Sequence, residues 1–169
     1  MKLEKKIYSM RATELAPYLL GKLLCRKVDG RIIKARICET ECYFGEEDTA
    51  CHAHKGKTER TKTLYEEGGI AYVYLCYGIH SLLNVVSGER GFPEAVLIRG
   101  VEGAIGPGRA SKLMQIGKEL NGISLTDSDE LWIEDDGYRV HAVKTDRRVG
   151  IDYADAEDRE RKWRFILDM

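Results

Sequence analysis

The chain has 169 residues and a formal net charge of −1 at pH 7, which is the size of one domain and argues mildly against a bulk nucleic-acid binder. Its 43% hydrophobic and 33% charged residues argue against disorder, and no apolar run reaches the ~18–20 residues of a membrane-spanning helix. The N-terminal residues contain no apolar stretch long enough for a signal peptide, so we expect a cytoplasmic protein whose five cysteines are reduced thiols.

The first elements along the chain are a short helix and a hairpin. We expect the helix over Glu14–Leu20, with Thr13 as its N-cap and Gly21 as its stop. Asp29-Gly30 lies between two β-like runs and predicts a tight hairpin turn. Residues 44–69 form a long polar connection, of a length that is often functional.

Most of the remaining elements are expected to be strands joined by hairpins or short loops. The expected strands are Lys22–Val28, Arg31–Tyr43, Ile70–Tyr77, Ser81–Ser87, Ala95–Val101 and short segments near 131–134, 139–143 and 163–167. Gly78-Ile79-His80 forms a second hairpin turn, and a second helix over Ser111–Leu120 follows the turn Gly106-Pro-Gly108. Regular helical crossovers are missing from this pattern, which favours one antiparallel α+β domain over a parallel doubly wound sheet.

Two glutamates lie on one face of the second strand. Alternation places Ile37, Glu39, Glu41 and Tyr43 on one face and Cys38, Thr40 and Cys42 on the other. A carboxylate pair beside apolar and aromatic neighbours is costly if it is buried without a partner or a purpose. On a solvent-exposed face the same pair would be ordinary, so the pattern leaves both interpretations open.

Cysteines and histidines follow this strand closely enough to suggest a metal site. Cys42, Cys51, His52 and His54 are the candidate ligands. Their spacing, C-x8-C-H-x-H, matches no common zinc arrangement, since structural sites usually contain C-x2–4-C pairs. We therefore expect no metal and no cofactor, and a metal-dependent hydrolase built on Glu41, His52 and His54 is a minor alternative.

Three further residues are unusual for their expected elements. Arg99 lies inside an apolar strand, where it needs a carboxylate or phosphate partner, and a structural ion pair would explain it equally well. Asn84 is likewise polar within an apolar strand and needs hydrogen-bond partners. Tyr77 precedes Gly78 at a hairpin tip, where an exposed aromatic could act as a wedge or fold back onto the sheet.

Several motifs, taken in order, resemble the alkyladenine (3-methyladenine/methylpurine) DNA glycosylase family. They are Glu39-Thr40-Glu41-Cys42-Tyr43, Glu47-Asp48, Ala50-Cys51-His52, Tyr72-Val73-Tyr74-Leu75-Cys76-Tyr77-Gly78, Leu83-Asn84-Val85, Val96-Leu97-Ile98-Arg99, Gly106-Pro107-Gly108, Ser111-Lys112-Leu113, Arg148-Val149-Gly150 and Trp163-Arg164-Phe165. The resemblance covers about residues 14–167. It implies a curved, mainly antiparallel sheet or barrel-like core with peripheral helices and a protruding hairpin.

The resemblance also implies a role for each candidate catalytic and base-binding residue. Glu41 would be the general base that activates a water, helped by Arg99 and the carbonyl of Val149. Tyr43 would stack on one side of a flipped purine, and His52 with Tyr74 on the other. Asn84 would disfavour the exocyclic amine of guanine. Tyr77 would intercalate into the duplex, and the remaining basic residues would contact phosphates: Lys55, Lys57, Arg60, Arg109 and Lys112.

The function implied is a monofunctional glycosylase that acts as a monomer on double-stranded DNA with damaged purines. Its substrates would be of the 3-methyladenine, 7-methylguanine, hypoxanthine and ethenoadenine type. A catalytically silent nucleic-acid-binding homologue is the alternative. The sequence departs from the family pattern at Cys42, Cys51, Glu59 and Ile79-His80, which puts the lesion range and DNA affinity in question.

Overall fold

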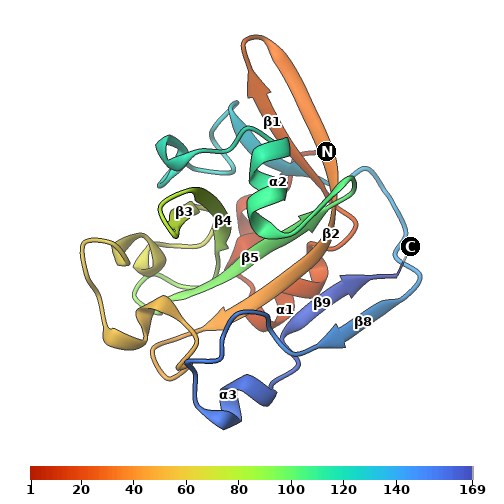
Figure 1. The fold of residues 1–169 in the computed structure, drawn as a ribbon. Coiled ribbons are helices and arrows are strands. Elements are labelled where there is room, and N and C mark those ends of the chain that lie inside the picture. The colour runs from red at the N-terminus through yellow and green to blue at the C-terminus, as the bar shows by residue number, and fades with distance from the viewer. Residues whose placement is uncertain (169) are drawn as a thin grey trace.

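Hairpins build an antiparallel sheet that curls into a half-barrel in the computed structural model, which describes residues 1–168 (Figure 1). Its strands are β1 Leu23–Val28, β2 Arg31–Phe44, β3 Ala71–Cys76, β4 His80–Val86, β5 Glu94–Val101, β6 Ala104–Ile105, β7 Leu131–Glu134, β8 Val143–Asp146 and β9 Arg164–Leu167. The main order is β3-β4-β5-β2-β1-β7, while β6 pairs with β5, and β9 pairs with both β2 and β8. This arrangement confirms the expected antiparallel α+β fold.

Three short α-helices and four 3-10 helices accompany the sheet within residues 1–168. The α-helices are α1 Ala12–Tyr18, α2 Pro107–Leu113 and α3 Ala156–Glu160, and the 3-10 helices are η1 Lys5–Ser9, η2 His52–Lys55, η3 Lys62–Tyr65 and η4 Lys118–Leu120. Helix α1 contacts β2 and β5, whereas α2 contacts β4 and β5. None of the helices in this described range is long and apolar enough to span a membrane.

Buried apolar side chains form two main groups, beside a small third one of Ala50, Ile151 and Ala154. The larger one joins α1, β1, β2, β4, β5 and α2, and includes Leu15, Ile37, Leu83 and Ile98. The smaller one joins η2, η3, β3 and the ends of β4 and β5, with Tyr72 and Tyr65 buried in it. The first supplies most of the apolar burial that stabilises the fold, and the second supports the residues of the candidate site.

Both expected hairpins are present. Asp29 and Gly30 have φ of +50° and +77°, as a two-residue hairpin turn between β1 and β2 requires. Tyr77 and Gly78 have φ of +54° and +70° at the tip of the β3–β4 hairpin. A non-glycine residue in this left-handed region is uncommon, and here it directs an aromatic side chain into solvent, because 92% of Tyr77 is exposed.

The expected helix ends are partly wrong. Helix α1 begins at Ala12, so Thr13 lies inside it and is not the N-cap; instead the Glu94 carboxylate of β5 accepts a hydrogen bond from the Ala12 amide at 2.5 Å. The second helix begins at Pro107 and ends at Leu113, because Gln115 adopts φ of +52° and interrupts it. These ends depend on a long-range contact and a backbone turn that carry no local sequence signal.

Further expectations about the elements also need correction. The strand expected at 139–143 is β8 at Val143–Asp146, where it pairs with β9. Strand β6 and helix α3 were not expected at all. A bulge in β2 breaks the alternation between Ile37 and Thr40, so Ile37 packs in the main core with Cys38 and Cys42 and does not share the face of Glu41.

Candidate active site

A cavity of about 460 Å³ lies between β3–β5, the η2–η3 connection and the segment after β8. This is within the usual size range of small-molecule sites. Of the expected site residues, it brings together Tyr43, His52, Arg60, Tyr74, Tyr77, Asn84, Arg99 and Val149. Glu41 is fully buried beside the cavity, where it contacts Tyr43, Val149 and Arg99. Lys55, Lys57, Arg109 and Lys112 do not line the cavity.

Glu41 is held by hydrogen bonds to both carboxylate oxygens. The Tyr43 hydroxyl donates to Oε1 at 2.8 Å, and the Val149 amide donates to Oε2 at 2.7 Å. Burial raises the pKa of Glu41 above its ordinary value, while these two donors and Arg99 act in the opposite direction. A carboxylate oxygen can accept more than one hydrogen bond. Each oxygen therefore retains the capacity to accept a further hydrogen bond.

Arg99 links the two glutamates of β2. Its Nε lies 3.4 Å from Glu39 Oε1 and 3.9 Å from Glu41 Oε2, which are ion-pair distances without hydrogen-bond geometry. Arg164 of β9 lies 3.1 Å from the same Glu39 oxygen. Glu39 therefore has two cationic partners and supports Arg99, whereas Arg99 itself also lines the cavity.

A buried ion pair positions the segment that contacts Glu41. The Arg148 guanidinium donates to both Asp48 oxygens, at 2.6 and 3.0 Å, and to the Cys42 carbonyl at 2.9 Å. It also lies 5.0 Å from the ring centroids of both Tyr43 and Trp163. Because Arg148 directly precedes Val149, this pair fixes the amide that binds Glu41.

Aromatic rings form two walls of the cavity. His52 and Tyr74 pack edge-to-face with centroids 4.4 Å apart, and Tyr72 lies 5.4 Å from Tyr74. The Tyr72 hydroxyl lies 3.1 Å from His52 Nδ1. Burial, followed by the charge of Arg60, lowers the pKa of His52 to about 4, so its ring is neutral at pH 7. Tyr43, on β2, also lines the cavity.

Asn84 of β4 is buried and lines the cavity. Its amide donates to the Tyr72 carbonyl at 3.4 Å. The amide oxygen has no protein partner among the hydrogen bonds of residues 1–168, so it is available to a ligand.

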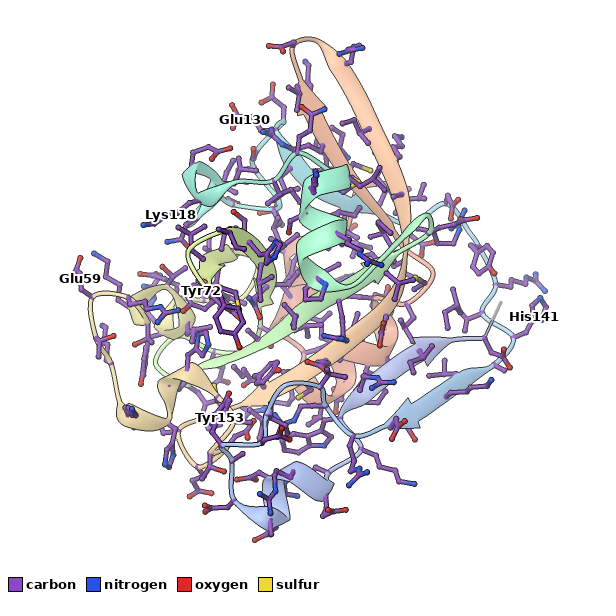
Figure 2. All side chains as sticks on the ribbon, viewed as in Figure 1. Glu59, Tyr72, Lys118, Glu130, His141 and Tyr153 are labelled. Carbon is purple, nitrogen blue, oxygen red and sulfur yellow. The ribbon has the colours of Figure 1, made fainter. Side chains whose placement is uncertain are left out.

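The basic residues expected to contact phosphates fall into two groups. Lys55, Lys57, Arg109 and Lys112 are exposed outside the cavity. Arg60 is exposed as well, but it also lines the cavity, with its guanidinium 5.6 Å from the centroid of Tyr74. Glu59 pairs with Lys62 and points outward (Figure 2), so it does not oppose the neighbouring Arg60.

The residues considered for a metal site have other contacts. Cys42 and Cys51 are buried in separate parts of the core. His54 Nδ1 lies 2.7 Å from the Glu46 carbonyl, and His52 faces Tyr72. Within residues 1–168 no three His, Cys, Asp or Glu side chains are grouped as metal ligands would be.

Two aromatic residues of the cavity were not expected from the sequence. Tyr153, on the segment before α3 and labelled in Figure 2, donates its hydroxyl to the Ala50 carbonyl at 2.7 Å and lines the cavity. Tyr72 belongs to a family-like motif but had no expected role in the site, and its hydroxyl contacts His52 beside the cavity. The odd position of a tyrosine within the acidic segment 152–160 was the only available signal for Tyr153.

Known proteins resemble this chain along nearly its whole length. The sequence model of the methylpurine-DNA glycosylase family matches residues 6–105 and 102–169. A protein of Psychrobacter cryohalolentis named "Putative 3-methyladenine DNA glycosylase" is 44% identical, over 83% of this chain and 80% of its own. Proteins with the same name in Methanocella arvoryzae and Borrelia garinii subsp. bavariensis are 40% and 37% identical, over 96% and 98% of this chain and 90% and 95% of theirs.

Proposed function

Since this chain belongs to the methylpurine-DNA glycosylase family, we propose that residues 1–169 form one monofunctional DNA glycosylase domain that removes damaged purines. The observation that carries the proposal is the buried Glu41, fixed by Tyr43 and Val149 beside a cavity with aromatic walls. Its substrate is double-stranded DNA with 3-methyladenine, 7-methylguanine, hypoxanthine or ethenoadenine lesions. The protein acts as a monomer in the cytoplasm, without a metal or cofactor, in base excision repair.

The reaction is hydrolysis of the N-glycosidic bond. Glu41 takes a proton from a water as the water oxygen forms a bond to the anomeric carbon of the sugar. The carbon–nitrogen bond breaks and its electron pair leaves with the base, while the carboxylate stabilises the oxocarbenium-like sugar. A pKa raised by burial suits this role, because a stronger base accepts the proton more readily. Arg99 and the carbonyl of Val149 hold the water, and the product is an abasic site.

The cavity recognises a purine that has left the helix. An enzyme cannot reach the glycosidic bond inside a stacked duplex, so the nucleotide must flip out. Tyr43 stacks on one face of the base, and His52 with Tyr74 on the other. The amide of Asn84 meets the 2-position of the purine and disfavours the exocyclic amine of guanine. Stacking depends little on the lesion shape, so several lesions fit.

The surface around the cavity suits a duplex. Tyr77, exposed at the hairpin tip and at the cavity edge, fills the gap left by the flipped base. Lys55, Lys57, Arg109 and Lys112 are exposed cations available to phosphates. Local charge of this kind allows a chain with a net charge of −1 to bind DNA.

The test is release of free base from an oligonucleotide duplex with a single hypoxanthine or ethenoadenine. The proposal predicts base release by the purified protein and an abasic product strand that alkali cleaves. Binding without release would favour a catalytically silent DNA-binding homologue. Loss of activity with a chelator would favour the metal-dependent hydrolase built on Glu41, His52 and His54.

A further inference from the structure

Arg60 is positioned in the cavity by its own loop. Thr58 and Thr61 hydrogen-bond each other through amide and hydroxyl groups at 2.9–3.2 Å, and the Thr61 hydroxyl also bonds the Gly56 carbonyl at 3.2 Å. These bonds brace the loop on both sides of Arg60. Its guanidinium lies over the ring of Tyr74, close enough for a cation–π contact.

The charge of Arg60 has no acidic partner among residues 1–168. The ion pairs of this described range do not include it, and the neighbouring Glu59 pairs with Lys62. No aspartate or glutamate is among the residues that line the cavity. Because its charge is not neutralised by a carboxylate, the guanidinium of Arg60 interacts electrostatically with a molecule bound in the cavity.

The other charges near the cavity balance one another. Arg99 lies within ion-pair distance of Glu39 and Glu41, and Arg164 also pairs with Glu39. The two carboxylates thus offset the two guanidinium groups, including that of Arg99, which lines the cavity. His52, which faces Arg60, is neutral at pH 7. The net charge that a bound base meets is therefore the positive charge of Arg60.

We propose that Arg60 is a specificity-determining residue that biases the base cavity toward neutral damaged purines, such as hypoxanthine, and against cationic alkylated purines, such as 7-methylguanine. This inference rests on the proposed glycosylase function. It also changes the expected role of Arg60, from a phosphate contact to a contact with the base.

The bias has two physical causes. A base alkylated at a ring nitrogen carries a positive charge before cleavage, and Arg60 repels it. A neutral base gains negative charge as it takes the electron pair of the broken bond, and Arg60 stabilises that charge. In a partly open site, repulsion between two neighbouring unit charges corresponds to a discrimination on the order of tenfold.

The experiment compares kcat/KM for two duplexes that differ only in the damaged base, hypoxanthine or 7-methylguanine. The variants are Arg60→Gln, which removes the charge, and Arg60→Lys, which keeps it. We expect Arg60→Gln to shift the ratio of 7-methylguanine to hypoxanthine kcat/KM upward by on the order of tenfold, and Arg60→Lys to keep most of the wild-type ratio. Far-ultraviolet circular dichroism confirms that the variants are folded.

Lys57→Gln is the matched control, because Lys57 lies in the same loop but does not line the cavity. Loss of a phosphate contact lowers kcat/KM for both duplexes by the same factor. This variant therefore leaves the ratio of 7-methylguanine to hypoxanthine kcat/KM unchanged. If Arg60→Gln behaved in the same way, Arg60 would be a phosphate contact and the inference would be wrong while the proposed function stood. If wild-type protein released neither base, both would be wrong.

Discussion

The buried Asp48–Arg148 ion pair offers a sharp test of how the segment 148–150 is held against Glu41. The Arg148 side chain is 0% and the Asp48 side chain 1% exposed, and their closest atoms are 2.6 Å apart. Substituting Arg148→Met leaves the Asp48 carboxylate buried without its cationic partner. It also removes the donors to the carbonyl oxygens of Cys42 and Asp158.

Removing one partner of a buried ion pair costs about 3–5 kcal/mol. For a chain of this size, that loss lowers Tm by about 6–20 °C. Arg147→Met is the matched control, because Arg147 pairs with Glu160 on the surface with side chains 59% and 68% exposed. Such a pair contributes about 0–1 kcal/mol, so the control should change Tm by less than about 4 °C.

Urea unfolding followed by circular dichroism measures both variants. We expect the double variant Asp48→Asn/Arg148→Met to lose less than the sum of the single losses, by about 0.5–3 kcal/mol, because no unpaired charge remains. If the free energies of unfolding of Arg148→Met and Arg147→Met differed by less than about 1 kcal/mol, the buried ion pair would not stabilise this segment as expected.

Three further predictions concern the cavity and the hairpin tip. Tyr77→Ala should lower the excision rate about 5- to 150-fold, because its stacking in the duplex is lost. The free energy of unfolding in urea should change by less than about 0.5 kcal/mol. An unchanged excision rate would rule out the wedge role. Tyr43→Phe removes a hydrogen bond that lowers the pKa of Glu41, so this pKa should rise further. Because the base acts in its ionised form, the acidic limb of the pH–rate profile should then move to higher pH, and a shift to lower pH would contradict this assignment. Since burial lowers the pKa of His52 to about 4, its ring resonances should not titrate between pH 6 and 8 in NMR spectra, whereas a midpoint near 6.5 would refute a buried neutral ring.

Local patterns predicted the fold where the controlling interactions are themselves local. The Asp29-Gly30 turn and the strand at 131–134 have the expected positions. The N-terminus of α1 does not, because the cap comes from Glu94, 82 residues further along the chain. The hydrophobic pattern does not reveal such a contact. It likewise does not reveal the register shifts around Glu39, which move Ile37 to the other face of β2.

In the candidate site too, local features could be predicted and long-range contacts could not. Family-like motifs predicted most of the residues that the cavity brings together, but not how they contact one another. The ion pair of Arg148 with Asp48 spans 100 residues, and the loop that carries Arg60 is held by hydrogen bonds between Thr58 and Thr61. Arg60 was expected to contact a phosphate because its neighbours are basic. The direction of its side chain, however, depends on the tertiary structure.

The central claim is that the Glu41 carboxylate activates the water that releases the base. Single-turnover excision of hypoxanthine from a duplex tests it in Glu41→Gln, with Glu47→Gln as an exposed control from the same segment. The account predicts a loss of about 10²- to 10⁴-fold in Glu41→Gln with duplex Kd retained, and the wild-type rate in Glu47→Gln. Excision by Glu41→Gln within about threefold of wild type would contradict it.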